Sequence, residues 1–167
     1  MKKRPAFSLL CAHPAHFISL GFGSGLAPKA PGTFGSFTAW GVFALADWLW
    51  PLAWRFEGMA VMLIVASFLI GAWCIERTGV ALGEVDHGAI VWDEFVAVWL
   101  VLALIPAAFG WQLVGVVIFR FFDIVKPWPI YIADRRFKNG LGVMFDDVLA
   151  AAYTLLCLQG LDRLVSF

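Results

Sequence analysis

Carboxylate side chains stand at the ends of the long apolar segments of this chain, where they could act on a charged group. They are Asp86, Asp93, Glu94, Asp123, Asp146 and Asp147. A carboxylate at the mouth of an apolar helix is costly near lipid, and a bound cation offsets that cost. Hard oxygen ligands with open positions suit Mg²⁺, which commonly also holds a substrate phosphate. The pattern therefore predicts a Mg²⁺ site formed by some of these residues.

Each acidic cluster also has a simpler interpretation. Acidic residues in the first turn of a helix interact favourably with the helix dipole, so Asp146 and Asp147 could be caps alone. Asp93 and Glu94 could simply mark the boundary of a membrane segment. The convergence of three such clusters on one face favours the metal site.

Basic residues and one histidine accompany the acids. In the segment FRFFDIVKPWPI, Arg120, Asp123 and Lys126 are spaced i, i+3, i+6 along one side of a helix that Pro127 ends. They form either a local ion-pair ladder or a metal carboxylate between two phosphate-binding cations. His87, beside Asp86, is a candidate proton donor, although a lone histidine is more often structural.

The composition favours a membrane as the solvent of this chain. It is 62% hydrophobic, whereas a soluble domain is about half apolar. The net charge is zero, so there is no electrostatic case for a nucleic-acid partner. Three scattered cysteines predict reduced thiols rather than a disulfide framework.

The apolar segments predict an all-α membrane bundle of about four to six helices with short or re-entrant arms. Residues 1–20 are expected to form a lead-in, for which an interfacial helix is one interpretation. The whole chain, 1–167, is expected to form one domain. One hairpin is expected from 37 to 83, with a helix end at Pro51, and a last helix from about 142 to 162. The uncharged run Phe95–Phe119 is either one crossing helix or a hairpin that turns at Ile105–Trp111. We prefer the hairpin, which would span residues 91–125, because it places every charged cluster on the cytoplasmic side.

Four sequence blocks together carry a family resemblance. GFGSGLAPKAPGTFGS, DHGAIVWDEF, FRFFDIVKPWPI and GLGVMFDD occur in this order between Gly21 and Ala151. They closely resemble the bacterial phosphatidylglycerophosphatase A family. Asn139 and Leu141 depart from the Gly-Gly and Met-like residues expected there, and Ala97 stands where a glycine is usual.

The resemblance implies a Mg²⁺-dependent phosphatase of the bacterial inner membrane, and the placement of the charged clusters predicts that its active site faces the cytoplasm. It would convert phosphatidylglycerophosphate to phosphatidylglycerol. Mg²⁺ would be held by some of the acids named above, while Lys126 and Arg120, with Lys29 as a weaker candidate, would bind phosphate oxygens. Metal-bound water is the preferred nucleophile, and an aspartyl phosphate through Asp123 or Asp146 is the alternative.

The first block, Gly21–Ser36, is the least chemically explicit of the four. On its own it indicates a linker, with Thr33 or Ser36 capping the next helix. With the resemblance, its glycines and stiff prolines indicate one wall of the headgroup site. Ser24, Lys29 and Thr33 are then the predicted polar contacts.

Other functions find less support in the sequence. The carboxylate pattern of lipid-headgroup phosphotransferases, D-G-x2-A-R-x8-G-x3-D-x3-D, is absent. A carrier would need acids spread through the depth of the bilayer, where only Asp47 is a candidate. Cys157 and Arg163 match the C-x5-R spacing of cysteine phosphatases, but the spacing lies at the end of an apolar helix rather than in an anion-binding loop.

Overall fold

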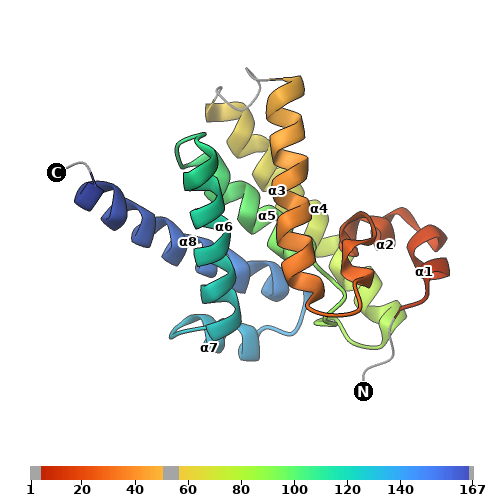
Figure 1. Ribbon diagram of the computed structural model, residues 1–167. Coiled ribbons are helices and arrows are strands. Elements are labelled where there is room, and N and C mark those ends of the chain that lie inside the picture. Colours follow the sequence, from red (N-terminus) through yellow and green to blue (C-terminus); the bar gives the residue numbers. More distant parts are fainter. Residues whose placement is uncertain (1–4, 51–56, 166–167) are drawn as a thin grey trace.

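A computed structural model describes residues 5–50 and 57–165, and every regular element in those ranges is helical (Figure 1). The prediction of an all-α protein is therefore confirmed over the described residues. The expected helix end at Pro51 lies outside them. In chain order the elements are α1 (Phe7–Ala12), α2 (Pro14–Ser19), η1 (Gly21–Leu26), α3 (Pro31–Leu49), α4 (Glu57–Leu82), α5 (Trp92–Ala103), α6 (Phe109–Val125), α7 (Ile130–Arg136) and α8 (Gly140–Val165).

Helix α3 begins earlier than the sequence indicated, at Pro31. Proline is well suited to the first helical position because its missing N–H would have no helical partner there. The residue before it, Ala30, is left-handed with φ 47° and makes no side-chain cap. The prediction that Thr33 or Ser36 caps this helix is therefore wrong. The Ser36 hydroxyl instead donates to the Gly32 carbonyl within the helix, at 3.0 Å.

The apolar run from Phe95 to Phe119 is broken as the hairpin prediction required. Helix α5 ends at Ala103 and α6 begins at Phe109, so the break includes Pro106. The two outer ends of this pair meet, because Arg120 near the end of α6 lies 3.3 Å from Glu94 in the first turn of α5. A single continuous helix would hold these two side chains far apart.

Helix α8 also begins earlier than about 142, at Gly140, and this changes the meaning of its acids. Its first turn contains no acidic residue, so Asp146 and Asp147 lie further along and do not cap it. The capping interpretation of these two aspartates is therefore wrong. Asn139 takes that role: its Oδ1 accepts a hydrogen bond from the Gly142 N–H at 2.8 Å.

Helix α5 is the central element of the bundle and contacts α3, α4, α6 and α8. Its side chains Phe95, Val98 and Val101 are almost completely buried. The Trp92 ring stacks on Phe95 with centroids 5.3 Å apart, and its Nε1 donates to the Ser67 carbonyl of α4 at 3.2 Å. Burial on all sides and this indole hydrogen bond fix the first turn of α5, which carries two of the predicted metal ligands.

Two helices in the described residues are long and apolar enough to cross a membrane by length and composition: residues 58–82 in α4 and 140–163 in α8. Helices α5 and α6 are shorter, in agreement with the short arms that were expected. The N-terminal helices α1 and α2 lie on the side of the bundle away from the C-terminal end of α8 (Figure 1). There the His16 ring hydrogen-bonds the Thr78 hydroxyl of α4 at 2.9 Å.

Candidate active site

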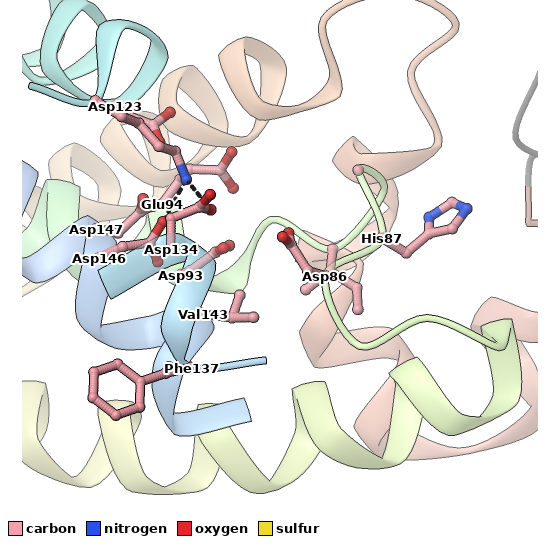
Figure 2. A pocket seen from close by; sticks show the side chains of 14 residues that line it. Asp86, His87, Asp93, Glu94, Asp123, Asp134, Phe137, Val143, Asp146 and Asp147 are labelled. Carbon is pink, nitrogen blue, oxygen red and sulfur yellow. Dashed lines mark hydrogen bonds and ion pairs between the residues drawn. The ribbon is translucent and has the colours of Figure 1, made fainter. Parts of the chain in front are cut away.

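A cavity of about 120 Å³ opens where α5 begins, α6 ends and α7 and α8 pass (Figure 2). It brings together all six acids singled out in the sequence, although they come from four separate segments. Its charged and titratable lining residues are Asp86, His87, Asp93, Glu94, Asp123, Lys126, Asp134, Asp146 and Asp147. Such a concentration of carboxylates in one cavity is the expected form of a cation site.

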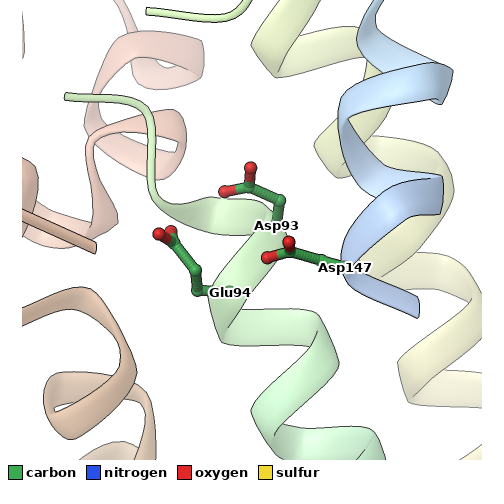
Figure 3. A group of neighbouring side chains, drawn as sticks. All are labelled: Asp93, Glu94 and Asp147. Carbon is green, nitrogen blue, oxygen red and sulfur yellow. The ribbon is translucent and has the colours of Figure 1, made fainter. Parts of the chain in front are cut away.

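Three of these carboxylates form the tightest cluster. Asp93 and Glu94 project from the first turn of α5, and Asp147 projects toward them from α8 (Figure 3). One carboxylate oxygen from each lies within 4.8 Å of the other two. Oxygens Asp93 Oδ1, Glu94 Oε2 and Asp147 Oδ2 are buried and have no hydrogen-bond partner among the described residues.

Buried carboxylate oxygens without donors are rare in folded proteins, because their lost hydration must be replaced. A divalent cation would replace it for all three at once. An all-carboxylate donor set favours a hard cation such as Mg²⁺, Mn²⁺ or Ca²⁺ over Zn²⁺ or copper. The residues present therefore fit a metal site.

The position of Asp147 depends on how α8 is anchored to α4. The Gly140 N–H donates to Glu76 Oε2 of α4 at 2.6 Å. A Cβ at Gly140 would lie only 2.1 Å from the Ala72 carbonyl oxygen, so glycine permits this close approach. The dipole of α8 also favours the negative charge of the Glu76 carboxylate at its N-terminus. The start of α8 is thus fixed two turns before its acids.

Arg120 joins the ends of α5 and α6. Its Nη1 contacts Asp123 Oδ2 on its own helix and Glu94 Oε1 on α5, the latter at 3.3 Å. All three side chains are largely buried. The Arg120 Nε is buried and has no hydrogen-bond partner in the described structure. This guanidinium therefore retains unused donor capacity beside the carboxylate cluster.

Lys126 takes different partners from those that its spacing indicated. It is the C-terminal cap of α6, with φ 45°, and its Nζ contacts Asp134 of α7 at 2.7 Å and also Asp146 of α8. The interpretation of Arg120, Asp123 and Lys126 as one local ladder is therefore wrong, since only Arg120 and Asp123 pair within the helix. Burial would lower the pKa of Lys126, but Asp146 and Asp134 outweigh it and raise this pKa above the ordinary lysine value.

Asp134 was not anticipated from the sequence. It is an acidic residue within a basic segment of the sequence, and that placement is the signal that could have revealed it. Burial would raise the pKa of Asp134, but the hydrogen bond and charge of Lys126 outweigh burial and lower it. Asp134 thus stays ionised and fixes the ammonium of Lys126, which lines the cavity.

Asp86 and His87 lie on the α4–α5 loop at the side of the cavity. The Asp86 carboxylate is bound by Lys138 Nζ at 2.9 Å and is not part of the three-carboxylate cluster. The His87 Nδ1 accepts a hydrogen bond from the Ala89 N–H at 3.2 Å, and its ring points away from the acids (Figure 2). The structure thus gives His87 a loop contact, and its catalytic role stays a prediction.

The predicted polar contacts of the first block are not among the lining residues of this cavity in the described structure. Ser24 donates to the Gly21 carbonyl at 2.8 Å, Lys29 is exposed and Thr33 is half-buried. The block reaches the site through Gly32 instead. A Cβ there would lie 2.2 Å from Glu94 Oε1 and 2.9 Å from one guanidinium nitrogen of Arg120. Sequence reasoning missed this residue because glycine has no functional group.

Comparison with known proteins now assigns the chain. The family model for phosphatidylglycerophosphatase A matches residues 17–162. The chain belongs to the phosphatidylglycerophosphatase A family. Phosphatidylglycerophosphatase A of Haemophilus influenzae is 42% identical over 160 residues, 93% of each chain. The Escherichia coli protein of the same name is 41% identical over 143 residues, 85% of this chain and 80% of the relative.

A protein of Bacteroides thetaiotaomicron with the provisional name phosphatidylinositol-3-phosphatase is 35% identical over 157 residues, 92% of this chain and 93% of its own length. No solved structure shows significant similarity. Membership of the phosphatidylglycerophosphatase A family makes the chain a phosphatase, so the resemblance recognised in the sequence is confirmed.

All four blocks of the phosphatidylglycerophosphatase A pattern contact the site or line it. The first supplies Gly32, the second Asp93 and Glu94, the third Arg120, Asp123 and Lys126, and the fourth Asp146 and Asp147. The departure at Asn139 is also explained, because its amide oxygen caps α8. The pattern is therefore one three-dimensional site divided among distant segments.

Proposed function

We propose that this enzyme hydrolyses the terminal phosphomonoester of phosphatidylglycerophosphate, giving phosphatidylglycerol and phosphate in phospholipid synthesis, and that the reaction depends on Mg²⁺. Support for the substrate comes from the two relatives named phosphatidylglycerophosphatase A. The observation that carries the metal dependence is the cluster of Asp93, Glu94 and Asp147, whose oxygens are buried without donors in the described structure.

We assign the metal-binding role first to this cluster, with Asp123 and Asp146 as neighbouring carboxylates in the same cavity. Asp86 is a more distant candidate because Lys138 occupies its carboxylate. A Mg²⁺ ion bound there would polarise the phosphoryl group and lower the pKa of a coordinated water.

The basic side chains are assigned to the phosphate. Lys126 is an ammonium held inside the cavity, and Arg120 retains an unpaired donor beside Glu94. Both can neutralise non-bridging oxygens, and charge neutralisation with positioning is the main part of phosphoryl-transfer catalysis. Ser24, Lys29 and Thr33 remain weaker candidates because they lie outside the cavity lining in the described structure. Arg120 is also outside that lining, but it is ion-paired with the lining residues Glu94 and Asp123.

Water is the preferred nucleophile in this proposal. Asp123 and Asp146 each have an oxygen in an ion pair, with Arg120 and Lys126 respectively. A carboxylate held by a cation is a weaker nucleophile than a free one, which makes an aspartyl phosphate the second choice. Water would attack phosphorus, the bond from phosphorus to the glycerol oxygen would break, and that oxygen would take a proton.

We further propose that the enzyme is a multi-pass protein of the bacterial inner membrane with this cavity at the cytoplasmic face. Helices α4 and α8 can span a bilayer, and Arg135, Arg136 and Lys138 are exposed cations in or directly after α7, the helix that contributes Asp134 to the cavity. Cytoplasmic loops carry such an excess of cations. In a cysteine-free variant, cysteines at Gly88 and Arg136 should react with an impermeant thiol reagent in inside-out vesicles and not in intact spheroplasts. Reaction of either in spheroplasts would reject this orientation.

The experiment that tests the function is phosphate release by the purified protein in detergent micelles. Phosphatidylglycerophosphate should release phosphate with Mg²⁺, lose that activity in EDTA, and regain it on adding Mg²⁺. A phosphatidylinositol 3-phosphate sample in the same micelles tests the activity named for the Bacteroides relative. Faster hydrolysis of the inositol lipid would change the proposed substrate, while release that survives chelation would reject the metal dependence.

A further inference from the structure

Two lysines contact carboxylates that line the same cavity. Lys126 lines the cavity and has 28% of its side chain exposed, whereas Lys138 is outside the lining of the described structure and is 52% exposed. Asp134 connects them, at 2.7 Å from Lys126 Nζ and 4.0 Å from Lys138 Nζ. The proposed function uses the inner cation and leaves the outer one without a role.

The pair formed by Lys138 and Asp86 joins this exposed lysine to an acid that lines the cavity. It joins the loop between α7 and α8 to the loop between α4 and α5, at 2.9 Å. Both side chains are substantially exposed, and an ion pair in that setting is weak and readily exchanged. An incoming anion with several acceptor oxygens can therefore replace Asp86 as the partner of this lysine.

The proposed substrate carries two phosphates at different distances from its diacylglycerol part. Its terminal phosphomonoester is the group hydrolysed, and a phosphodiester joins the glycerol to the diacylglycerol. When the monoester lies among the carboxylates and Lys126, the diester lies further out along the substrate. Lys138 is more exposed than Lys126 and contacts two lining residues, Asp86 and Asp134, so it is a cation on the outer side of the cavity.

We propose that Lys138 is a specificity-determining residue that binds the internal phosphodiester of the substrate and thereby selects lipids carrying two phosphates. This inference rests on the proposed function. The diester does not react, so its contact persists equally in ground state and transition state. Removing such uniform binding raises KM and leaves kcat unchanged.

A purely structural interpretation gives Lys138 a different role, as a latch between the two loops. Loss of a latch would disturb the carboxylates themselves, because Asp86, Asp93 and Asp134 line one cavity. It would therefore lower kcat and weaken every ligand of the inner site, inorganic phosphate included. The two interpretations thus predict different kinetic patterns.

The test compares Lys138→Gln, Lys138→Arg and the control Arg136→Gln in the full-length protein. Arg136 is an exposed cation on the neighbouring helix α7. Phosphatidylglycerophosphate kinetics and inhibition by inorganic phosphate are measured in the same micelles. Lys138→Gln should raise KM about tenfold, as expected for one charge-assisted hydrogen bond, with kcat and the phosphate inhibition constant unchanged. Lys138→Arg should restore most of the loss, and Arg136→Gln should match the wild type.

Two results would overturn the inference while leaving the proposed function intact. An unchanged KM in Lys138→Gln would show that this lysine does not meet the substrate. A raised KM together with a lowered kcat and weaker inhibition by phosphate would establish the structural role of Lys138 as a latch between the two loops. A wild-type protein that releases no phosphate from this lipid would instead reject the proposed function and the inference together.

Discussion

Replacing Gly32 with alanine should impair catalysis without unfolding the protein. The added Cβ would lie 2.2 Å from Glu94 Oε1 and 2.9 Å from an Arg120 nitrogen. Non-bonded atoms prefer separations near 3.5 Å, so the Glu94 carboxylate would have to retreat by roughly 1 Å. Both displaced groups are the far ends of long side chains, which can move without moving the backbone. The fold therefore survives while the geometry of the carboxylate cluster changes.

The expected loss follows from the sensitivity of catalysis to position. A displacement of about 1 Å at a catalytic group can cost on the order of 10²-fold in rate. Gly41→Ala on the same helix is the matched control, because a Cβ there meets nothing within 4 Å. It should keep full activity, and its thermal stability should rise by up to about 1 kcal/mol from helix propensity.

The assay is phosphate release from phosphatidylglycerophosphate, with thermal unfolding of each variant measured in the same detergent. Gly32→Ala with wild-type turnover would refute the close approach of the first block to Glu94. Gly32→Ala that unfolds at a much lower temperature than Gly41→Ala would show a structural rather than a catalytic role.

Three further predictions concern other parts of the site. Lys126→Met should lose most of the phosphatase activity, and Lys126→Arg should lose less. Burial lowers the pKa of Lys126, but the neighbouring acids outweigh it and raise this pKa, so wild-type rates measured from about pH 7 to 9 should show no lysine titration. Glu76→Ala should lower the free energy of unfolding by about 1 kcal/mol through loss of its bond to Gly140, whereas Glu76→Gln should retain most of it, as thermal melts would show. Cys157→Ser should keep near-normal turnover, since this exposed thiol lies on α8 beyond the residues that line the cavity; a loss of several orders of magnitude would revive a cysteine mechanism.

The elements that carry strong local signals were predictable from the sequence. Pro106, within the predicted turn Ile105–Trp111, indicated the break between α5 and α6, and the acids at the ends of apolar runs indicated the cavity. These features depend on backbone restriction and on the cost of charge near lipid, both of which act within a short window. Helix α7 was not anticipated, because seven residues are too few for a clear hydrophobic period.

The partners of individual side chains could not be predicted, because tertiary packing decides them. Lys126 does not pair along α6 with Asp123 because the backbone is left-handed at Lys126, the residue that ends the helix. Asp86 is paired with Lys138 because the α4–α5 and α7–α8 loops meet beside the cavity. Gly32 is important for the space it leaves empty, and that space exists only after α3 packs beside α5.

The most direct test of the account is the Mg²⁺ dependence of phosphate release in wild type and Asp147→Asn. The wild type should be inactive after EDTA treatment and regain activity when Mg²⁺ is added. Asp147→Asn should need at least about tenfold more Mg²⁺ for half-maximal activity, because one of three clustered carboxylates is lost. Identical Mg²⁺ activation curves for the two proteins, or full activity in EDTA, would contradict a metal site at this cluster.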